Sequence, residues 1–298
     1  MATPQAAFDA AELEQLRTPV GARLRQLVRK QPLGAAGAFV VIIMGLSAIF
    51  AGLISPYNPV ANDLASMLQP PDASHWMGTD EFGRDILTRV MYGARTALTI
   101  GLTAAFLGAT GGLILGVASA YFGGIFDLVS QRIVDVFMAF PLIIMALAVV
   151  ATLGPGTQNV IIAITIPFIP QCARVVRSSA LAIREIPYVD AARALGFSNT
   201  RIILRHMVPN VMAPYLIMLS TFVGQAILLE AVLSYLGMGV QDPTPAWGLM
   251  LKGGAEEFLE SAPWVSIFPG LAISFAVFGF NLFGDAMRDV LDPKLRRD

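Results

Sequence analysis

Residues 136–173 read VFMAFPLIIMALAVVATLGPGTQNVIIAITIPFIPQCA, and no charged side chain interrupts them. A helix needs about 20 apolar residues to cross the hydrocarbon core of a bilayer. This stretch is therefore long enough for two membrane-spanning helices. The turn formed by Gly154, Pro155 and Gly156 divides it, and we expect helices at 134–153 and 157–173.

Four further apolar stretches predict the other membrane helices. The first follows a basic segment, as in a signal peptide, but it runs without charge from 31 to 62. That length exceeds a signal core, so we expect a retained helix. The sequence thus predicts an all-α integral membrane protein with six transmembrane helices, the remaining four at 34–54, 97–122, 211–236 and 261–284.

The composition supports a membrane protein. Hydrophobic residues make up 55% of the 298 and charged residues only 14%, whereas a soluble domain averages about 25% charged residues. The net charge of −1 gives no field that would attract nucleic acid. The single cysteine, Cys172, lies in an apolar run and is expected to be a packing residue.

The distribution of Lys and Arg predicts the orientation. With six spans, 16 of the 20 basic residues fall on the side that holds both termini. Cytoplasmic loops carry the excess of Lys and Arg, so we expect both termini in the cytoplasm. The predicted organisation is a tail at 1–33, helix 34–54, an extracytoplasmic loop at 55–96, a core at 97–287 with a cytoplasmic loop at 174–209, and a tail at 288–298.

The outer loop at 55–96 is expected to contain an amphipathic helix. Thr79 is a reasonable N-cap, and Phe82, Ile86 and Val90 then share one face. Asp85 and Arg89 would pair at i, i+4. We expect this helix to lie at the outer membrane interface.

The loop between the fourth and fifth helices reads EIPYVDAARALG at 185–196, then FSNTRIILRHMVPN at 197–210. Pro187 suits the first helical position and Gly196 the position after the last, which predicts a helix at 187–195. A helix this short needs packing to be stable. The surface formed by Ala191, Ala192 and Leu195 permits close approach, so we expect the helix to dock into a groove on another protein.

At these residues the sequence resembles a known family. The loop is similar to the "EAA" loop of permease subunits of bacterial ABC importers, in which Glu-Ala-Ala is followed by Gly and then Ile-x-Leu-Pro. Here Asp190-Ala191-Ala192 stands for the triplet, and Gly196 and Pro209 follow at the right spacing. Three residues depart from the pattern: Asp190 replaces Glu, His206 replaces Ile and Val208 replaces Leu. The strings GTDEFGRDILTR at 78–89 and GMGVQDPTPAWG at 237–248 resemble the dipeptide and oligopeptide branch, most closely its C-type subunit.

The resemblance implies the type I fold of ABC importer permeases in a bacterial inner membrane, multi-pass. It implies a second permease subunit as heterodimer partner, two ATPase subunits, an extracytoplasmic substrate-binding protein and a peptide substrate. No phosphate-binding loop motif occurs in the chain, so we expect no enzyme activity and no cofactor on this subunit. ATP and Mg would be bound by the ATPases. The coupling residues would be Pro187, Asp190, Ala191, Ala192, Leu195, Gly196 and Pro209.

The translocation pathway is less well marked. Glu230 and Gln225 in the fifth span are candidates for the pathway or an outer gate, although Glu230 is also placed to reach interfacial water. No cluster of metal ligands is expected, since His75 and His206 fall on opposite sides. Nickel and glutathione remain alternatives to a di- or oligopeptide cargo. A secondary transporter driven by an ion gradient is a further alternative, but it would need paired charges at mid-membrane.

Overall fold

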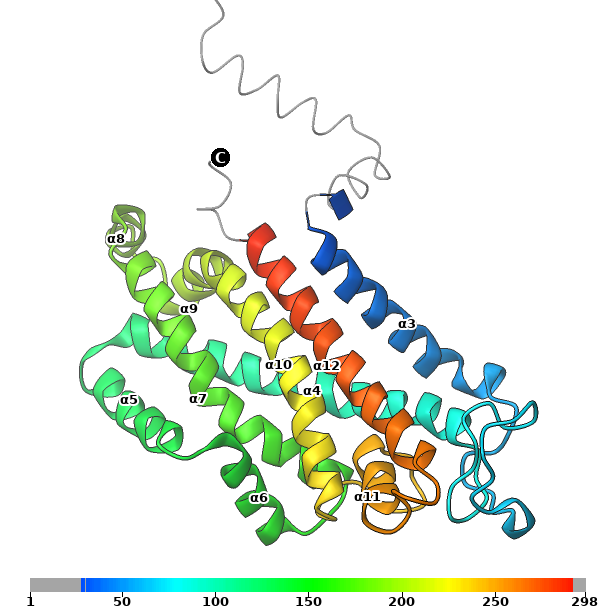
Figure 1. The fold of residues 1–298 in the computed structure, drawn as a ribbon. Helices are drawn as coiled ribbons and strands as arrows, with labels where there is room; N and C mark the ends of the chain where they lie inside the picture. Colours follow the sequence, from blue (N-terminus) through cyan, green and yellow to red (C-terminus); the bar gives the residue numbers. More distant parts are fainter. Residues whose placement is uncertain (1–27, 30, 292–298) are drawn as a thin grey trace, which may run out of the picture.

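The computed structural model describes residues 28–29 and 31–291 (Figure 1). Most of the predicted N-terminal tail and the end of the C-terminal tail lie outside the described residues. So do seven of the basic residues that predict the orientation, namely Arg17, Arg23, Arg25, Lys30, Lys294, Arg296 and Arg297.

The described chain is helical, and its only β feature there is an isolated bridge between Thr79 and Asp85. The long helices are α3 (Pro32–Ile54), α4 (Ile86–Phe122), α7 (Thr157–Arg184), α10 (Met212–Tyr235) and α12 (Trp264–Leu291). The shorter elements are η1 (Leu64–Ser66), α5 (Gly124–Met138), α6 (Leu142–Leu153), α8 (Pro187–Ala194), α9 (Asn199–Ile202), η2 (Ile203–Met207), η3 (Val208–Val211) and α11 (Trp247–Glu257).

Five helices are long and apolar enough to cross a membrane, and α5 with α6 would make a sixth span if the bent pair counts as one. The continuous helix predicted at 134–153 is wrong, because α5 and α6 meet at 90°. Pro141 is the N-cap of α6. A proline lacks the N–H that would continue the helix and disfavours α geometry in the residue before it, Phe140.

Helices α4 and α7 pack closely through a stripe of glycines on α4. Gly108, Gly112 and Gly116 recur every fourth residue, so they lie on one face. A methyl group added at Gly112 would lie 2.4 Å from the Cβ of Cys172 and 2.8 Å from the carbonyl oxygen of Ile169. The glycines therefore let the backbones approach, and Cys172 is a buried packing residue as expected.

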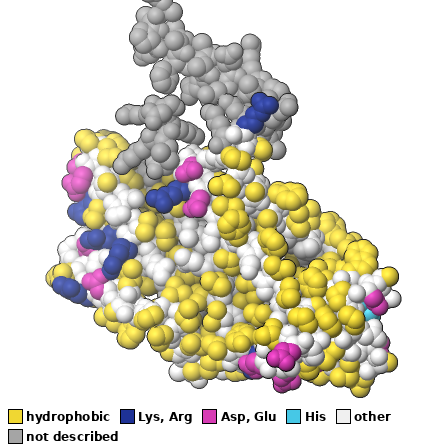
Figure 2. Space-filling view, in the orientation of Figure 1, with side chains coloured by type: hydrophobic (Ala, Val, Ile, Leu, Met, Phe, Trp, Pro, Cys, Tyr) yellow, Lys and Arg dark blue, Asp and Glu magenta, His cyan; other side chains and the backbone are white. Residues whose placement is uncertain are grey.

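Two loop regions lie at opposite ends of the long helices. Figure 1 shows α8 and α9 near one end and the loop at 55–85 at the other. In Figure 2 charged side chains gather towards the ends of this face, and hydrophobic side chains dominate between them. We refer to the two ends as the α8 end and the 55–85 end.

The amphipathic helix expected to start near Thr79 is wrong. Residues 79–85 form a turn, and Asp85 caps α4 by accepting a 2.8 Å hydrogen bond from the amide of Thr88. The other carboxylate oxygen of Asp85 lies 3.0 Å from Nδ1 of His75, so Asp85 does not pair with Arg89. A carboxylate serves well at an N-cap because it satisfies free amides and faces the positive end of the helix dipole.

Candidate functional site

The residues predicted to start and stop the short helix α8 are found at its two ends. Pro187 occupies the first turn, and Gly196 follows the helix with φ of +76°, in the left-handed region. The amide of Phe197 donates to the carbonyl of Ala192 at 3.1 Å, and that of Gly196 donates to Arg193 at 2.9 Å. This pair of bonds is a Schellman motif, which satisfies carbonyls at the helix end.

One face of α8 packs on the chain and the other is open. Val189 and Ala192 are buried, whereas Asp190, Ala191 and Leu195 are exposed, Leu195 to 74%. The docking surface predicted from 191, 192 and 195 is therefore narrower, because Ala192 packs inward. Pro187, Gly196 and Pro209 are also exposed at this end.

The segment at 199–211, which follows α8, is irregular. Ser198 caps α9 by accepting from the amide of Arg201 at 3.4 Å. The helix then widens to a π-helical segment, η2, and narrows to the 3₁₀ turn η3 before α10 begins. Pro209 lies in η3, and its missing N–H and bulky ring explain the departure from α geometry.

Side chains join α8 to the segment that leads into α10. Tyr188 donates its hydroxyl to the carbonyl oxygen of His206 at 3.1 Å. Asn210 donates from Nδ2 to that same carbonyl at 2.7 Å and to the Tyr188 hydroxyl at 3.1 Å. These hydrogen bonds connect Tyr188 of α8 to η2 and η3, the segments that precede α10.

A second set of contacts joins the loop to the end of α4. The Tyr121 hydroxyl donates to Oδ1 of Asn199 at 2.7 Å, and the guanidinium of Arg193 lies 5.2 Å from the Tyr121 ring centre. Arg184 donates to the carbonyl of Ala120 at 3.0 Å. These contacts could not be predicted from the sequence, because the partners lie far apart along the chain.

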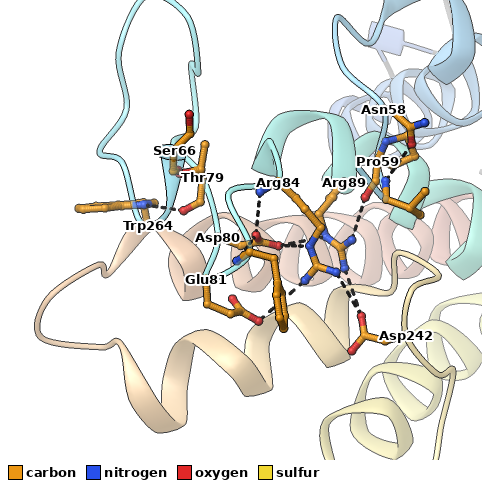
Figure 3. A network of polar contacts seen from close by, with 12 residues as sticks. Asn58, Pro59, Ser66, Thr79, Asp80, Glu81, Arg84, Arg89, Asp242 and Trp264 are labelled. Carbon is orange, nitrogen blue, oxygen red and sulfur yellow. Dashed lines mark hydrogen bonds and ion pairs between the residues drawn. The ribbon is translucent and has the colours of Figure 1, made fainter. Parts of the chain in front are cut away.

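At the 55–85 end a charged cluster joins two loops (Figure 3). Arg84 and Arg89 are buried and lie between the carboxylates of Asp80 and Asp242. Nε of Arg84 is 2.6 Å from Oδ2 of Asp80, and its Nη1 is 3.4 Å from Oδ1 of Asp242. Arg89 also donates to the carbonyl of Pro59 at 2.9 Å. Charge-assisted bonds of this kind fix the turn at 79–85 against the loop after α10.

The two residues predicted for the pathway lie in different surroundings. Glu230 is 1% exposed and accepts a 2.7 Å hydrogen bond from the Ser234 hydroxyl, so the expectation that it reaches interfacial water is wrong. The Ser234 oxygen also accepts from the amide of Val240, which ties α10 to the following loop. Gln225 is exposed on α10 beside Leu228 at the next turn. Its role in a pathway stays a prediction.

Comparison with protein families gives two matches. Residues 112–297 match the family described as "Binding-protein-dependent transport system inner membrane component". Residues 23–71 match the "N-terminal TM domain of oligopeptide transport permease C".

Curated relatives match nearly the full chain. A putative peptide transport system permease protein of Brucella suis is 45% identical over 280 residues, covering 94% of each chain. The dipeptide transport system permease protein DppC of Alkalihalophilus pseudofirmus is 43% identical, covering 90% of this chain and 88% of that one. The glutathione transport system permease protein GsiD of Escherichia coli is 42% identical, and the match covers 98% of this chain and 97% of that one.

Among solved structures, the inward-facing MetNI methionine ABC transporter is similar in fold. Its matched chain superposes with a TM-score of 0.56 at 19% identity, covering 70% of this chain and 98% of that one. The helices that carry the loop at the α8 end thus belong to an architecture known from ABC transporters.

Proposed function

The chain belongs to the family of binding-protein-dependent transport system inner membrane components, and from this premise we propose that the loop at 185–209 couples it to separate ATPase subunits. The protein is a multi-pass permease subunit of an ABC importer, a transport subunit rather than an enzyme. This assignment decides against a secondary transporter driven by an ion gradient.

The observation that carries the proposal is the arrangement of α8. Its exposed face, formed by Asp190, Ala191 and Leu195, points away from the chain, while its ends are fixed by Pro187 and the Schellman motif at Gly196. A short, capped helix with one free face suits docking into a groove. An ATPase cleft would receive this face.

The coupling movement would pass through two routes. Tyr188 and Asn210 join α8 to η3, which leads into α10, and Tyr121 with Asn199 joins the loop to α4. ATP binding that closes the ATPases would shift α8 as a rigid unit and move both long helices with it. Such coupling requires that ATP favour one of the two transporter states over the other. ATP and Mg would be held by the ATPases, where hydrolysis resets the cycle.

The same proposal predicts how the chain is oriented in the membrane. The α8 end would face the cytoplasm, where ATP is available, and the 55–85 end would face outward. Arg174, Arg177, Arg184, Arg193 and Arg201 all lie towards the α8 end, which agrees with the positive-inside rule. The loops at 55–85 and 237–246 would then meet a substrate-binding protein, and a second permease subunit would complete the pathway.

The cargo proposed is a short peptide. The relatives in Brucella suis and Alkalihalophilus pseudofirmus are named for peptide and dipeptide transport, which favours that class. Glutathione, named for the Escherichia coli relative, is the second candidate and is itself a small peptide.

Affinity purification of a tagged copy from membranes tests the coupling assignment. Wild-type protein should bring down its ATPase subunits, and the double variant Ala191→Glu, Gly196→Lys should lose them because charge and bulk enter the docking face. The matched control is Ala182→Glu, which places the same carboxylate on an exposed position of α7 at the same end. Equal recovery of ATPases with all three proteins would refute docking through α8.

A further inference from the structure

The 55–85 end contains a cavity of about 270 Å³ that the coupling mechanism does not use. It lies between the turn at 79–85 and helix α11, next to the cluster of Figure 3. Its apolar wall includes Phe82, Leu249 and Val265. Its volume is close to the lower limit of about 300 Å³ for small-molecule sites, and eight of its fourteen lining residues are charged.

The charged lining carries both signs. Glu81, Glu256 and Glu257 supply carboxylates, while Lys252 and Arg89 supply cations. Among the described residues, Lys252, Glu256 and Glu257 form no ion pair, and Glu81 has only a 3.8 Å contact with Arg84. Burial raises the pKa of Glu81, because desolvation disfavours the charged carboxylate.

The buried side chain of Arg89 is a second, independent feature of the cavity wall. Its side chain is 1% exposed, and within the described chain its Nε has no hydrogen-bond acceptor and only a 3.5 Å contact with Asp80. A buried donor without an acceptor is costly unless a ligand or water completes it. Arg89 lines the cavity together with Arg84, so the two guanidinium groups, which contact Asp80 and Asp242, contribute positive charge to its wall.

We propose that this cavity binds the zwitterion of a short peptide at the mouth of the transporter. The peptide's ammonium group would face Glu256, Glu257 and Glu81, and its carboxylate would face Lys252 and Arg89. The apolar wall would contact the peptide's side chains. The site would select molecules with both charged termini free, and it rests on the peptide cargo proposed above.

Direct binding of radiolabelled alanyl-alanine tests the site. The assay uses the complete transporter in lipid nanodiscs without its binding protein. Blocking either terminus, as in N-acetyl-alanyl-alanine or alanyl-alaninamide, should weaken binding about tenfold, since each removes a charged hydrogen-bonding group. Equal affinity for the blocked and free peptides would overturn the proposal, and this comparison needs no variant protein.

Variants then locate the site. Lys252→Met and Glu256→Gln should each weaken binding of alanyl-alanine about tenfold. The matched control is Glu260→Gln, an exposed carboxylate that does not line the cavity, and it should bind like wild type. Unchanged binding in both cavity variants would overturn the proposal. So would cross-linking of the Glu256→Cys variant to a lysine of the binding protein by a short maleimide–succinimidyl ester reagent, because the binding protein would then occupy the cavity.

A parallel uptake assay separates this inference from the proposed function. Proteoliposomes with the binding protein and ATP should accumulate the same dipeptide. ATP-driven uptake without binding at the cavity would refute the cavity alone. A transporter that accumulates no peptide under these conditions would refute the proposed cargo, and the cavity site with it.

Discussion

Replacement of Gly196 by alanine isolates the backbone requirement at the end of α8. A Cβ at this position would meet no atom within 4 Å, so the substitution introduces no steric clash with other residues. The cost is the left-handed conformation itself, at φ of +76°, which is about 1–2 kcal/mol for a residue with a side chain. That free energy corresponds to a factor of about 5–30 in the local opening equilibrium.

Hydrogen exchange measures this equilibrium directly. The amide of Phe197 is held by the carbonyl of Ala192, and it should exchange about 5–30 times faster in Gly196→Ala than in wild type. Gly196→Asn should fall between the two, because asparagine tolerates the left-handed region better. Gly124→Ala is the matched control, since Gly124 also has positive φ and open space, and it should change exchange only near α5. An unchanged rate at Phe197 would refute the argument that the Schellman motif fixes the end of α8.

Three further outcomes are expected. Gly112→Leu should lower the free energy of unfolding by about 1–3 kcal/mol, because its side chain would overlap Cys172, whereas Gly45→Leu, in open space on α3, should not change the Tm in detergent. Glu81→Gln should stabilise the protein relative to wild type, and the difference should grow as pH rises above 4.5. The reason is that burial raises the pKa of Glu81, so ionisation of this carboxylate opposes folding. A difference in Tm that does not depend on pH would contradict this. Tyr121→Phe removes one hydrogen bond from α4 to the loop, worth about 1 kcal/mol, and should reduce peptide uptake per ATP hydrolysed, while unaltered stoichiometry would argue against that route.

The sequence predicted the features that depend on local chemistry. In the structure α8 starts at Pro187 and is followed by Gly196. Whether a proline starts a helix or a glycine ends one depends only on neighbouring residues, so these limits could be predicted from the sequence. The break at Pro141 was also local, and the long charge-free run concealed it because hydrophobicity alone does not distinguish one helix from two at an angle.

Features that depend on distant residues could not be predicted in the same way. The cluster of Arg84 and Arg89 needs Asp242, although three long helices, α4, α7 and α10, lie between residues 84 and 242 in the sequence. Burial of Glu230 likewise depends on the loop that returns over α10 through Val240. Helical spacing places Glu230 near the C-terminal end of α10 but does not determine which neighbours surround it.

The glycine contact between α4 and α7 restricts how a transport cycle can proceed. Because the two backbones touch along several turns, neither helix can rotate or slide past the other without separating the whole contact. The pair must therefore travel as one body. The regular helical hydrogen bonding is interrupted at the 90° corner before α6, at the π-helical segment before α10, and at Pro167 and Pro170 inside α7. The corner and the π-helical segment lie on either side of α7 in the chain, so the connections of α7 to α5 and to α10 can bend as α7 moves with α4.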